Sequence, residues 1–178
     1  MAILWKRELD DIITPMQLGN ERIQCVEVRG NPNTISVYLP CRGSNNHFTE
    51  LNECLDHLHE IFETFKNSHQ MIIGGDLNEN IYSSTNSQRK TAISNFMSEH
   101  KLSTVECGIT FIHPSGQAMS AIDYILFQDH YKENVIKIEK QEINSNVSDH
   151  TPLMLSLKCD ISFKKIKELT NTKNLKVN

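Results

Sequence analysis

An aspartate and an asparagine two residues apart follow an apolar run that ends in two glycines, in the stretch "MIIGGDLN". This pattern places Asp76 and Asn78 at the end of a short buried strand. Taken alone, it is also typical of a turn in which such side chains bond to the backbone. Asp123 is harder to explain in that way, because it interrupts the apolar segment "SAIDYIL", where a carboxylate without a partner is costly.

Three more polar residues adjoin strand-like runs. Asp149 and His150 come directly before a strand-like run in "SDHTPL", and Tyr38 ends "ISVY". A turn cap and a core tyrosine are the ordinary explanations of these positions. As a set, the residues fit metal-assisted hydrolysis of a phosphodiester, which needs a positioned water, a base and positive charge on the phosphoryl oxygens.

Each of these tasks has a candidate residue. Hard divalent cations such as Mg²⁺ prefer carboxylate oxygens and keep water ligands for a substrate phosphate. A carboxylate and an amide on one loop can hold the attacking water. A histidine beside a buried carboxylate stays protonated, because the nearby negative charge raises its pKa, and it can then face the phosphate.

Length and composition limit the class of protein. The chain has 178 residues, enough for one domain with its own core, and we predict a domain over 1–160 followed by a polar tail over 161–178. Its net charge of −4 argues against an overall basic surface for nucleic acid, but not against a local basic patch. No stretch is long enough for a membrane helix, so we expect no membrane partner. The five cysteines are odd in number and form no CxxC pair, which favours reduced thiols in an intracellular protein, nuclear or cytoplasmic.

The elements that must position these residues alternate between strands and helices, which indicates an α/β fold. Helical spacing of apolar residues predicts helices over 47–66 and 86–102. Strand-like runs occupy 22–30, 34–40, 70–75, 108–114, 120–127, 134–143 and 151–158.

Three stretches, "IIGGDLN", "GITFIHPSGQAMSAIDYIL" and "SDHTPLMLSL", occur in this order, and "AILWKREL" stands at the start. The combination resembles the endonuclease/exonuclease/phosphatase superfamily. It is most similar to the endonuclease domains of non-LTR retrotransposons, which are related to apurinic/apyrimidinic endonucleases and are associated with reverse transcriptase. The resemblance implies an α/β sandwich of two sheets and hydrolysis of DNA with Mg²⁺, or Mn²⁺ in its place, as cofactor.

The resemblance also implies roles for the loop after the glycines. Asp76 would be the base that activates water, and Asn78 would orient this water and contact the substrate. Tyr38 would contact the phosphate. The two glycines would let the phosphate approach the end of the strand.

On the other side of the expected site, the resemblance implies that Asp123 orients His150. His150 would then stabilise the charge that develops on the phosphorus centre. Asp149 would belong to the metal-binding part of the site, and His113, in "TFIHPSG", would contact the DNA.

One part of the family pattern has no match. The family carries an asparagine on one strand and a metal-binding glutamate at the end of the next, both before "AILW", and no residue here corresponds to either. We therefore expect a domain that lacks its N-terminal part, binds Mg²⁺ weakly and has little activity alone. A phosphatase of the same superfamily and a non-catalytic remnant are the alternatives.

Cys54, His57 and His59 offer a second set of metal-binding residue types on the first predicted helix. His57 and His59 are two residues apart and so face different sides of a helix, which leaves only Cys54 and His57 able to share an ion. We expect a solvated helix face here rather than a zinc site.

Overall fold

The computed structural model describes residues 1–159 except 31, 44, 117–118 and 144–145, so the predicted tail over 161–178 lies outside the described residues. Its centre is a six-stranded sheet in the order β1-β2-β3-β4-β8-β5. The strands are β1 (Ile13–Met16), β2 (Ile23–Val28), β3 (Asn33–Tyr38), β4 (Met71–Asp76), β8 (Asp123–Gln128) and β5 (Leu102–Ser103). β3 and β4 are parallel, whereas the other neighbours are antiparallel.

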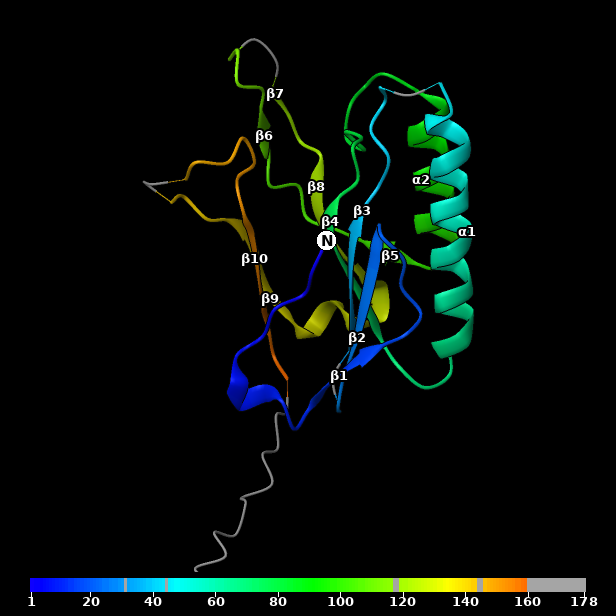
Figure 1. Ribbon diagram of the computed structural model, residues 1–178, viewed down its shortest axis with the longest axis vertical. Coiled ribbons are helices and arrows are strands. Elements are labelled where there is room, and N and C mark those ends of the chain that lie inside the picture. The colour runs from blue at the N-terminus through cyan, green and yellow to red at the C-terminus, as the bar shows by residue number, and fades with distance from the viewer. Residues whose placement is uncertain (31, 44, 117–118, 144–145, 160–178) are drawn as a thin grey trace, which may run out of the picture.

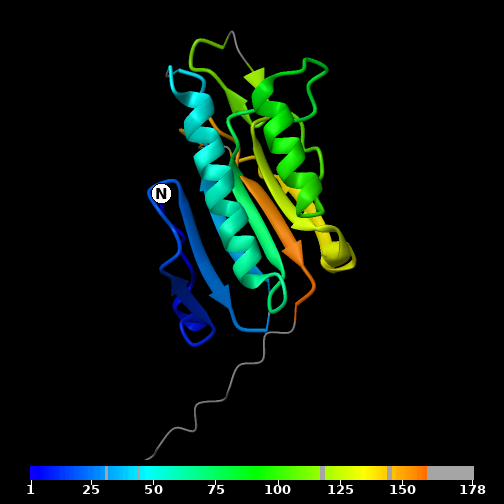
Figure 2. The ribbon, with the colours of Figure 1, turned by 90° about the vertical axis from the view of Figure 1, so that its right-hand side faces the viewer.

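Two helices, α1 (His47–Phe65) and α2 (Gln88–Glu99), cover one face of this sheet, as Figure 2 shows. The apolar face predicted for α1 is confirmed, because Leu51, Leu55, Leu58, Ile61 and Phe62 are all buried in the main core. Burial of these side chains is the main force that holds α1 on the sheet. Neither helix is apolar enough over enough residues to cross a membrane.

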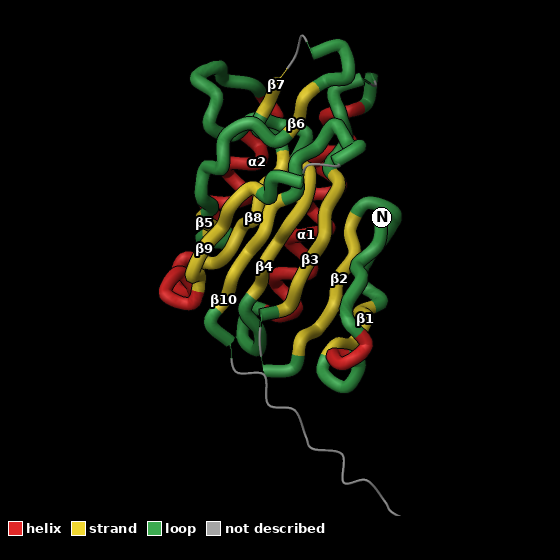
Figure 3. Tube along the Cα trace, turned by 90° about the vertical axis from the view of Figure 1, so that its left-hand side faces the viewer, coloured by secondary structure: helices red, strands yellow, loops and turns green. Residues whose placement is uncertain are grey.

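A second layer lies on the opposite face of the sheet. β9 (Val135–Lys140) and β10 (Leu153–Leu157) pair with each other and form a two-stranded sheet, seen to the left of the main sheet in Figure 1 and in front of it in Figure 3. Ile138 of β9 packs with Ile72, Ile125 and Phe127 in a second, smaller core. The predicted α/β sandwich is therefore confirmed, with a sheet on one face of the central sheet and helices on the other.

Some predicted boundaries were wrong. The run over 108–114 forms only the two-residue strand β6 (Phe111–Ile112), which pairs with β7 (Met119–Ser120) in a separate hairpin. The run over 120–127 is broken before β8, because Thr110 binds the backbone of 122 and 123. The second helix ends at Glu99, and Leu102 belongs to β5. β1 was missed, as were two short 3₁₀ helices, η1 (Arg7–Leu9) and η2 (Asp129–Asn134).

The parallel pair β3–β4 decides where polar residues gather. Each strand is followed by a helix that returns over the sheet, so both strands end at the same edge. β8 runs in the opposite direction and begins at that edge. Tyr38, Asp76 and Asp123 are consequently the terminal residues of three neighbouring strands.

The two glycines of β4 have different functions. Gly75 has φ +147°, and a Cβ atom there would lie 2.0 Å from the carbonyl oxygen of Val37 on β3. Gly74 is less restricted, because a Cβ there would approach only Ile125, at 4.0 Å. Gly75 is therefore required by the approach of the neighbouring strand, a reason that the sequence did not reveal.

Replacing Gly75 by alanine tests this requirement. We expect Gly75→Ala to lower the free energy of unfolding by about 2–4 kcal/mol, because the new methyl group collides with rigid backbone and the φ angle is unfavourable for L residues. Urea unfolding followed by circular dichroism measures the change. The control is Gly43→Ala at an exposed loop position, where a Cβ would make only an ordinary contact with Sγ of Cys41 at 3.9 Å and we expect a change within about 0.5 kcal/mol. Equal stabilities of the two variants would contradict the steric explanation.

Candidate active site

The site is built on three adjacent strand ends. In the sheet register, Tyr38 of β3 is opposite Asp76 of β4, and Asp76 is opposite Asp123 of β8. Residues in register on neighbouring strands project from the same face. Backbone pairing thus brings three residues from distant parts of the sequence to neighbouring strand ends.

His150 completes this cluster from the other layer. Its Nδ1 lies 2.9 Å from Oδ2 of Asp123, with both side chains partly buried. The carboxylates of Asp76 and Asp123 and a ring nitrogen of His150 all lie within 4.8 Å of one another. Asp76, Asp123 and His150 therefore meet at one place, and His150 is the partner that the partly buried carboxylate of Asp123 needed.

Thr110, which sequence reasoning missed, holds the two halves of this cluster together. Its side chain is fully buried, and Oγ1 accepts hydrogen bonds from the backbone N–H groups of Ile122 and Asp123. Its carbonyl oxygen accepts from the N–H of Thr151, the residue after His150. A single threonine thereby fixes the start of β8 relative to the segment that carries the histidine.

Asn78 is held beside Asp76 by both of its amide groups. Its backbone N–H donates to Oδ1 of Asp76 at 2.7 Å, and its Nδ2 donates to the carbonyl oxygen of Leu39, also at 2.7 Å. Asn78 has φ +50°, a conformation that asparagine tolerates better than most residues. Asp76 and Asn78 thus form the turn that their sequence suggests, and this turn also fixes the orientation of the Asn78 side chain beside Asp76.

The surroundings raise the pKa of both Asp76 and His150, for different reasons. Burial, reinforced by the charge of Asp123, raises the pKa of Asp76 from 3.8 to about 6. Burial lowers the pKa of His150, but the hydrogen bond to Asp123 and the neighbouring carboxylates outweigh this, so the net pKa is raised. Near neutral pH the arrangement holds a carboxylate with strong proton affinity beside a histidine that favours its charged form.

A cavity of about 380 Å³ opens beside the cluster. Asp123 and His150 line one side, and Ser36, Gly74 and Gly75 line its floor on the central sheet. Small residues on the floor leave the strand backbones accessible. The expectation that the glycines let a phosphate approach this strand end stays a prediction.

The remaining predicted residues lie at the edge of this cluster. Tyr38 is 45% exposed, and the guanidinium of Arg22 lies 5.8 Å from its ring centroid. Asp149 is exposed and next to His150, whose pKa its charge helps to raise, but its carboxylate is not a member of the three-residue cluster. His113 is exposed and bonds Ser115 in the β6–β7 hairpin. The predicted roles of these three residues in metal or substrate binding stay predictions.

Phe111 connects the hairpin to the site. It forms an isolated β-bridge with His150, and the two rings lie 4.9 Å apart. The N–H of Ile112 also donates to the carbonyl oxygen of Asp149. The β6–β7 hairpin therefore adjoins the histidine, which places exposed His113 on the same side of the molecule as the cluster.

An ion-pair network that the sequence did not indicate borders Asn78. Glu79 is 4% exposed, and its carboxylate binds Arg42 at 2.6 Å and Arg89 at 3.4 Å. Arg89 also donates to the carbonyl oxygens of Pro40 and His47, which fixes the loop after β3. Arg42 and Asn78 line a second cavity, of about 480 Å³. Arg42 is exposed and so supplies positive charge at the rim of the site.

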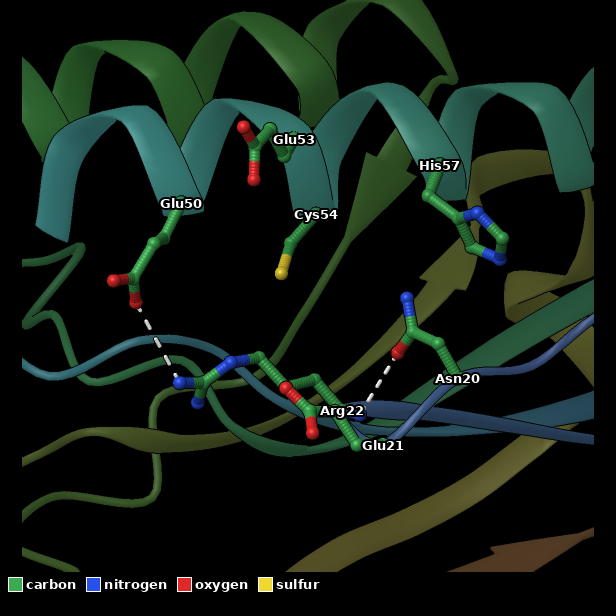
Figure 4. A pocket seen from close by; sticks show the side chains of 7 residues that line it. All are labelled: Asn20, Glu21, Arg22, Glu50, Glu53, Cys54 and His57. Carbon is green, nitrogen blue, oxygen red and sulfur yellow. Dashed lines mark hydrogen bonds and ion pairs between the residues drawn. The ribbon is translucent and has the colours of Figure 1, made fainter. Parts of the chain in front are cut away.

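A third hollow, of about 450 Å³, lies between α1 and the segment before β2, away from the cluster (Figure 4). Arg22 forms an ion pair with Glu50 across it, at 3.5 Å. Cys54 is buried, which raises the pKa of its thiol, and Nε2 of His57 lies 2.5 Å from the carbonyl oxygen of Leu18. The prediction of a fully solvated face was therefore wrong at Cys54, because this side chain belongs to the main core.

The cluster fits a divalent metal ion. Asp76 and Asp123 offer carboxylate oxygens within reach of one another, and these are the ligands that hard cations prefer. Burial raises the pKa of Asp76 to about 6, and the nearby Asp123 adds to this effect. A cation beside these carboxylates would stabilise their charged forms.

Comparisons with known proteins agree with this geometry. The sequence profile of a family described as endonuclease–reverse transcriptase matches residues 33–154, which include every member of the cluster. A comparison with curated proteins gives no significant match.

Solved structures share the fold at low sequence identity. The endonuclease domain of TRAS1, a telomere-specific non-LTR retrotransposon, is similar with a TM-score of 0.70 and 17% identity, over 85% of this chain and 71% of that one. The 3′ phosphatase NExo from Neisseria, bound to a product DNA hairpin, gives 0.65 and 15%, over 82% and 72%. The 3′–5′ exonuclease NExo from Neisseria meningitidis gives 0.59 and 15%, over 76% and 64%.

The raised pKa of Asp76 predicts a pH-dependent stability. Its folded-state pKa of about 6 exceeds the ordinary 3.8, so the folded protein binds more protons than the unfolded chain between these pH values. Ionisation of Asp76 therefore lowers the free energy of unfolding as the pH rises through this window. Asp76→Asn removes the charge and keeps an acceptor for the N–H of Asn78.

We expect Asp76→Asn, measured in chelator, to be more stable than the parent at pH 7, by an amount on the order of 1–2 kcal/mol after solvent screening. The difference should disappear below about pH 4, where the parent carboxyl is protonated as well. Urea unfolding at both pH values measures it. A variant less stable than the parent at pH 7 would show that the ionised carboxylate is well compensated.

Proposed function

Because the chain belongs to the endonuclease–reverse transcriptase family, we propose that it hydrolyses phosphodiester bonds of DNA, as an endonuclease of the retrotransposon type. The observation that carries the proposal is the cluster of Asp76, Asp123 and His150, assembled from both layers of the sandwich. A base and a histidine in contact with a carboxylate, next to an open cavity, are the parts that such hydrolysis requires.

Asp76 is the base in this proposal. A carboxyl with a pKa of about 6 is largely ionised at neutral pH, yet it accepts a proton more readily than an ordinary aspartate. Asn78 is locked by its bond to Leu39, so its position relative to Asp76 is fixed before substrate arrives. The pair holds a water molecule against the phosphorus, and Asp76 takes a proton from it as the new P–O bond forms. The P–O bond to the leaving oxygen breaks, and this oxygen takes up a proton from solvent.

His150 stabilises the charge that develops on the phosphoryl oxygens. Asp123 occupies its Nδ1, which leaves Nε2 as the donor toward a substrate. The same contact favours the protonated ring. Asp123 acts here as a positioning residue, because Thr110 fixes its backbone and the hydrogen bond fixes the imidazole.

A metal ion, which we propose to be Mg²⁺, would be held at the carboxylates of the cluster, with Asp149 as the ligand expected from the sequence. Mg²⁺ neutralises charge on the phosphoryl oxygens. We propose that Arg42, which lines the cavity next to Asn78, and Tyr38, at the end of β3, contact the DNA backbone.

A second candidate function has support from one comparison. NExo, similar in fold, is described as a 3′ phosphatase and as a 3′–5′ exonuclease. The same cluster could remove a terminal phosphate, because the attack of water on phosphorus is common to both reactions. Parallel assays of a supercoiled plasmid, a 3′-phosphorylated oligonucleotide and a small phosphomonoester distinguish the two functions.

Plasmid nicking tests the endonuclease. We expect faint nicking by this chain with Mg²⁺ and none with chelator, because few anionic oxygens bind the cation. Joining a family-like N-terminal segment, with its asparagine and glutamate strands, should increase the rate. In that extended chain, Asp76→Ala should lower the rate by about 10²–10⁴-fold, since no other base is in place.

The control for this experiment is Asp56→Ala, which removes an exposed carboxylate of α1 and should leave nicking unchanged. All variants are first compared by circular dichroism, so that loss of fold is not mistaken for loss of chemistry. If the extended Asp76→Ala chain nicks as fast as its parent, the assigned mechanism is wrong. If only the phosphorylated oligonucleotide is processed, the phosphatase is the better description.

A further inference from the structure

A second group of metal-binding side chains lies on the helical layer. His59 of α1, Glu99 at the end of α2 and His100 just after it each place one donor atom within 4.8 Å of the others. The proposed hydrolysis makes no use of these residues. They bridge the two helices, which are otherwise joined mainly by apolar contacts such as the edge-to-face pair of Phe62 and Phe96.

The separations between the donor atoms suit a tetrahedral ion. Nδ1 of His59 lies 3.2 Å from Nε2 of His100 and 3.3 Å from Oε1 of Glu99. Around Zn²⁺, bonds of about 2.0–2.1 Å to nitrogen and oxygen ligands give donor separations of about 3.3–3.4 Å. The distances from Nδ1 of His59 to His100 and to Glu99 are close to this separation between two ligand atoms of a tetrahedral zinc ion.

The surroundings hold the ligands in place. The ring of His100 packs against Phe62 and Phe96, with centroid distances of 4.5 and 4.7 Å. Glu99 and His100 also stand at the C-terminal end of α2, where the helix dipole favours a cation.

We propose that His59, Glu99 and His100 form a binding site for a borderline divalent metal ion of the Zn²⁺ type, which braces α1 against α2. The ion replaces the proton shared between the two facing ring nitrogens, and that proton moves to an outer ring nitrogen or to solvent. Water fills the fourth position. This site is separate from the oxygen-rich cluster of Asp76 and Asp123, which suits a harder cation.

Zinc binding is measured by competition with a chromophoric chelator, in excess Mg²⁺ so that the oxygen-rich cluster is not counted. We expect one bound Zn²⁺ per chain, and a rise in Tm of about 5–10 °C at a hundredfold excess over Kd. His59→Gln should weaken the affinity by about tenfold or more, and Glu99→Gln should also weaken it. Both positions are at the helix surface, so the variants are expected to fold.

Two variants serve as controls. His130→Gln changes an exposed histidine of η2 and should bind zinc as the parent does. His150→Gln changes the catalytic cluster and should keep this zinc while losing nicking, so the two proposals fail separately. Equal zinc affinity of the parent and His59→Gln would overturn the inference, as would zinc lost in His150→Gln but retained in His59→Gln.

Discussion

The pairing of β4 with β8 places two carboxylates directly opposite each other, and the organisation of the site follows from this constraint. Asp76 and Asp123 are register partners, so backbone hydrogen bonds force like charges together at a partly buried strand end. Such a pair is unfavourable unless a proton, a cation or a positive side chain compensates it. In this fold His150 compensates Asp123, and Asp76 is left with a raised pKa.

This division makes the two carboxylates chemically different. The carboxylate of Asp123 is paired with the imidazole of His150 and its backbone is held by Thr110, which suits the positioning role that we propose. Asp76 has a raised pKa and lies beside Asn78, which suits the base that we propose. In the proposed mechanism, two residues of one type take different roles because their surroundings differ.

The two layers contribute unequally to the site. The central sheet supplies Asp76 and Asp123 on rigid, paired strands, whereas His150 comes from the segment before β10 in the outer sheet. That outer sheet rests on a small core of Ile72, Ile125, Phe127 and Ile138. The distance from the histidine to Asp123 therefore depends on how well this second core packs, in addition to the anchoring by Thr110.

The two helices and the longer strands could be predicted from the amino-acid sequence, and so could the candidate residues Asp76, Asp123 and His150. The periodicity of apolar residues predicted α1, because this pattern is local. The carboxylate of Asp123 inside an apolar run indicated that it needs a partner, because burying an unpaired charge is costly. Other features of the site and the fold depend on tertiary contacts that the sequence did not indicate. Three such features join residues that are distant in sequence. They are the ion pairs of Glu79 with Arg42 and Arg89, the hydrogen bonds of Thr110 to the start of β8, and the contact of His59 with His100. β1 and β5 form because neighbouring strands offer them backbone partners, a contribution to stability that no local pattern contains.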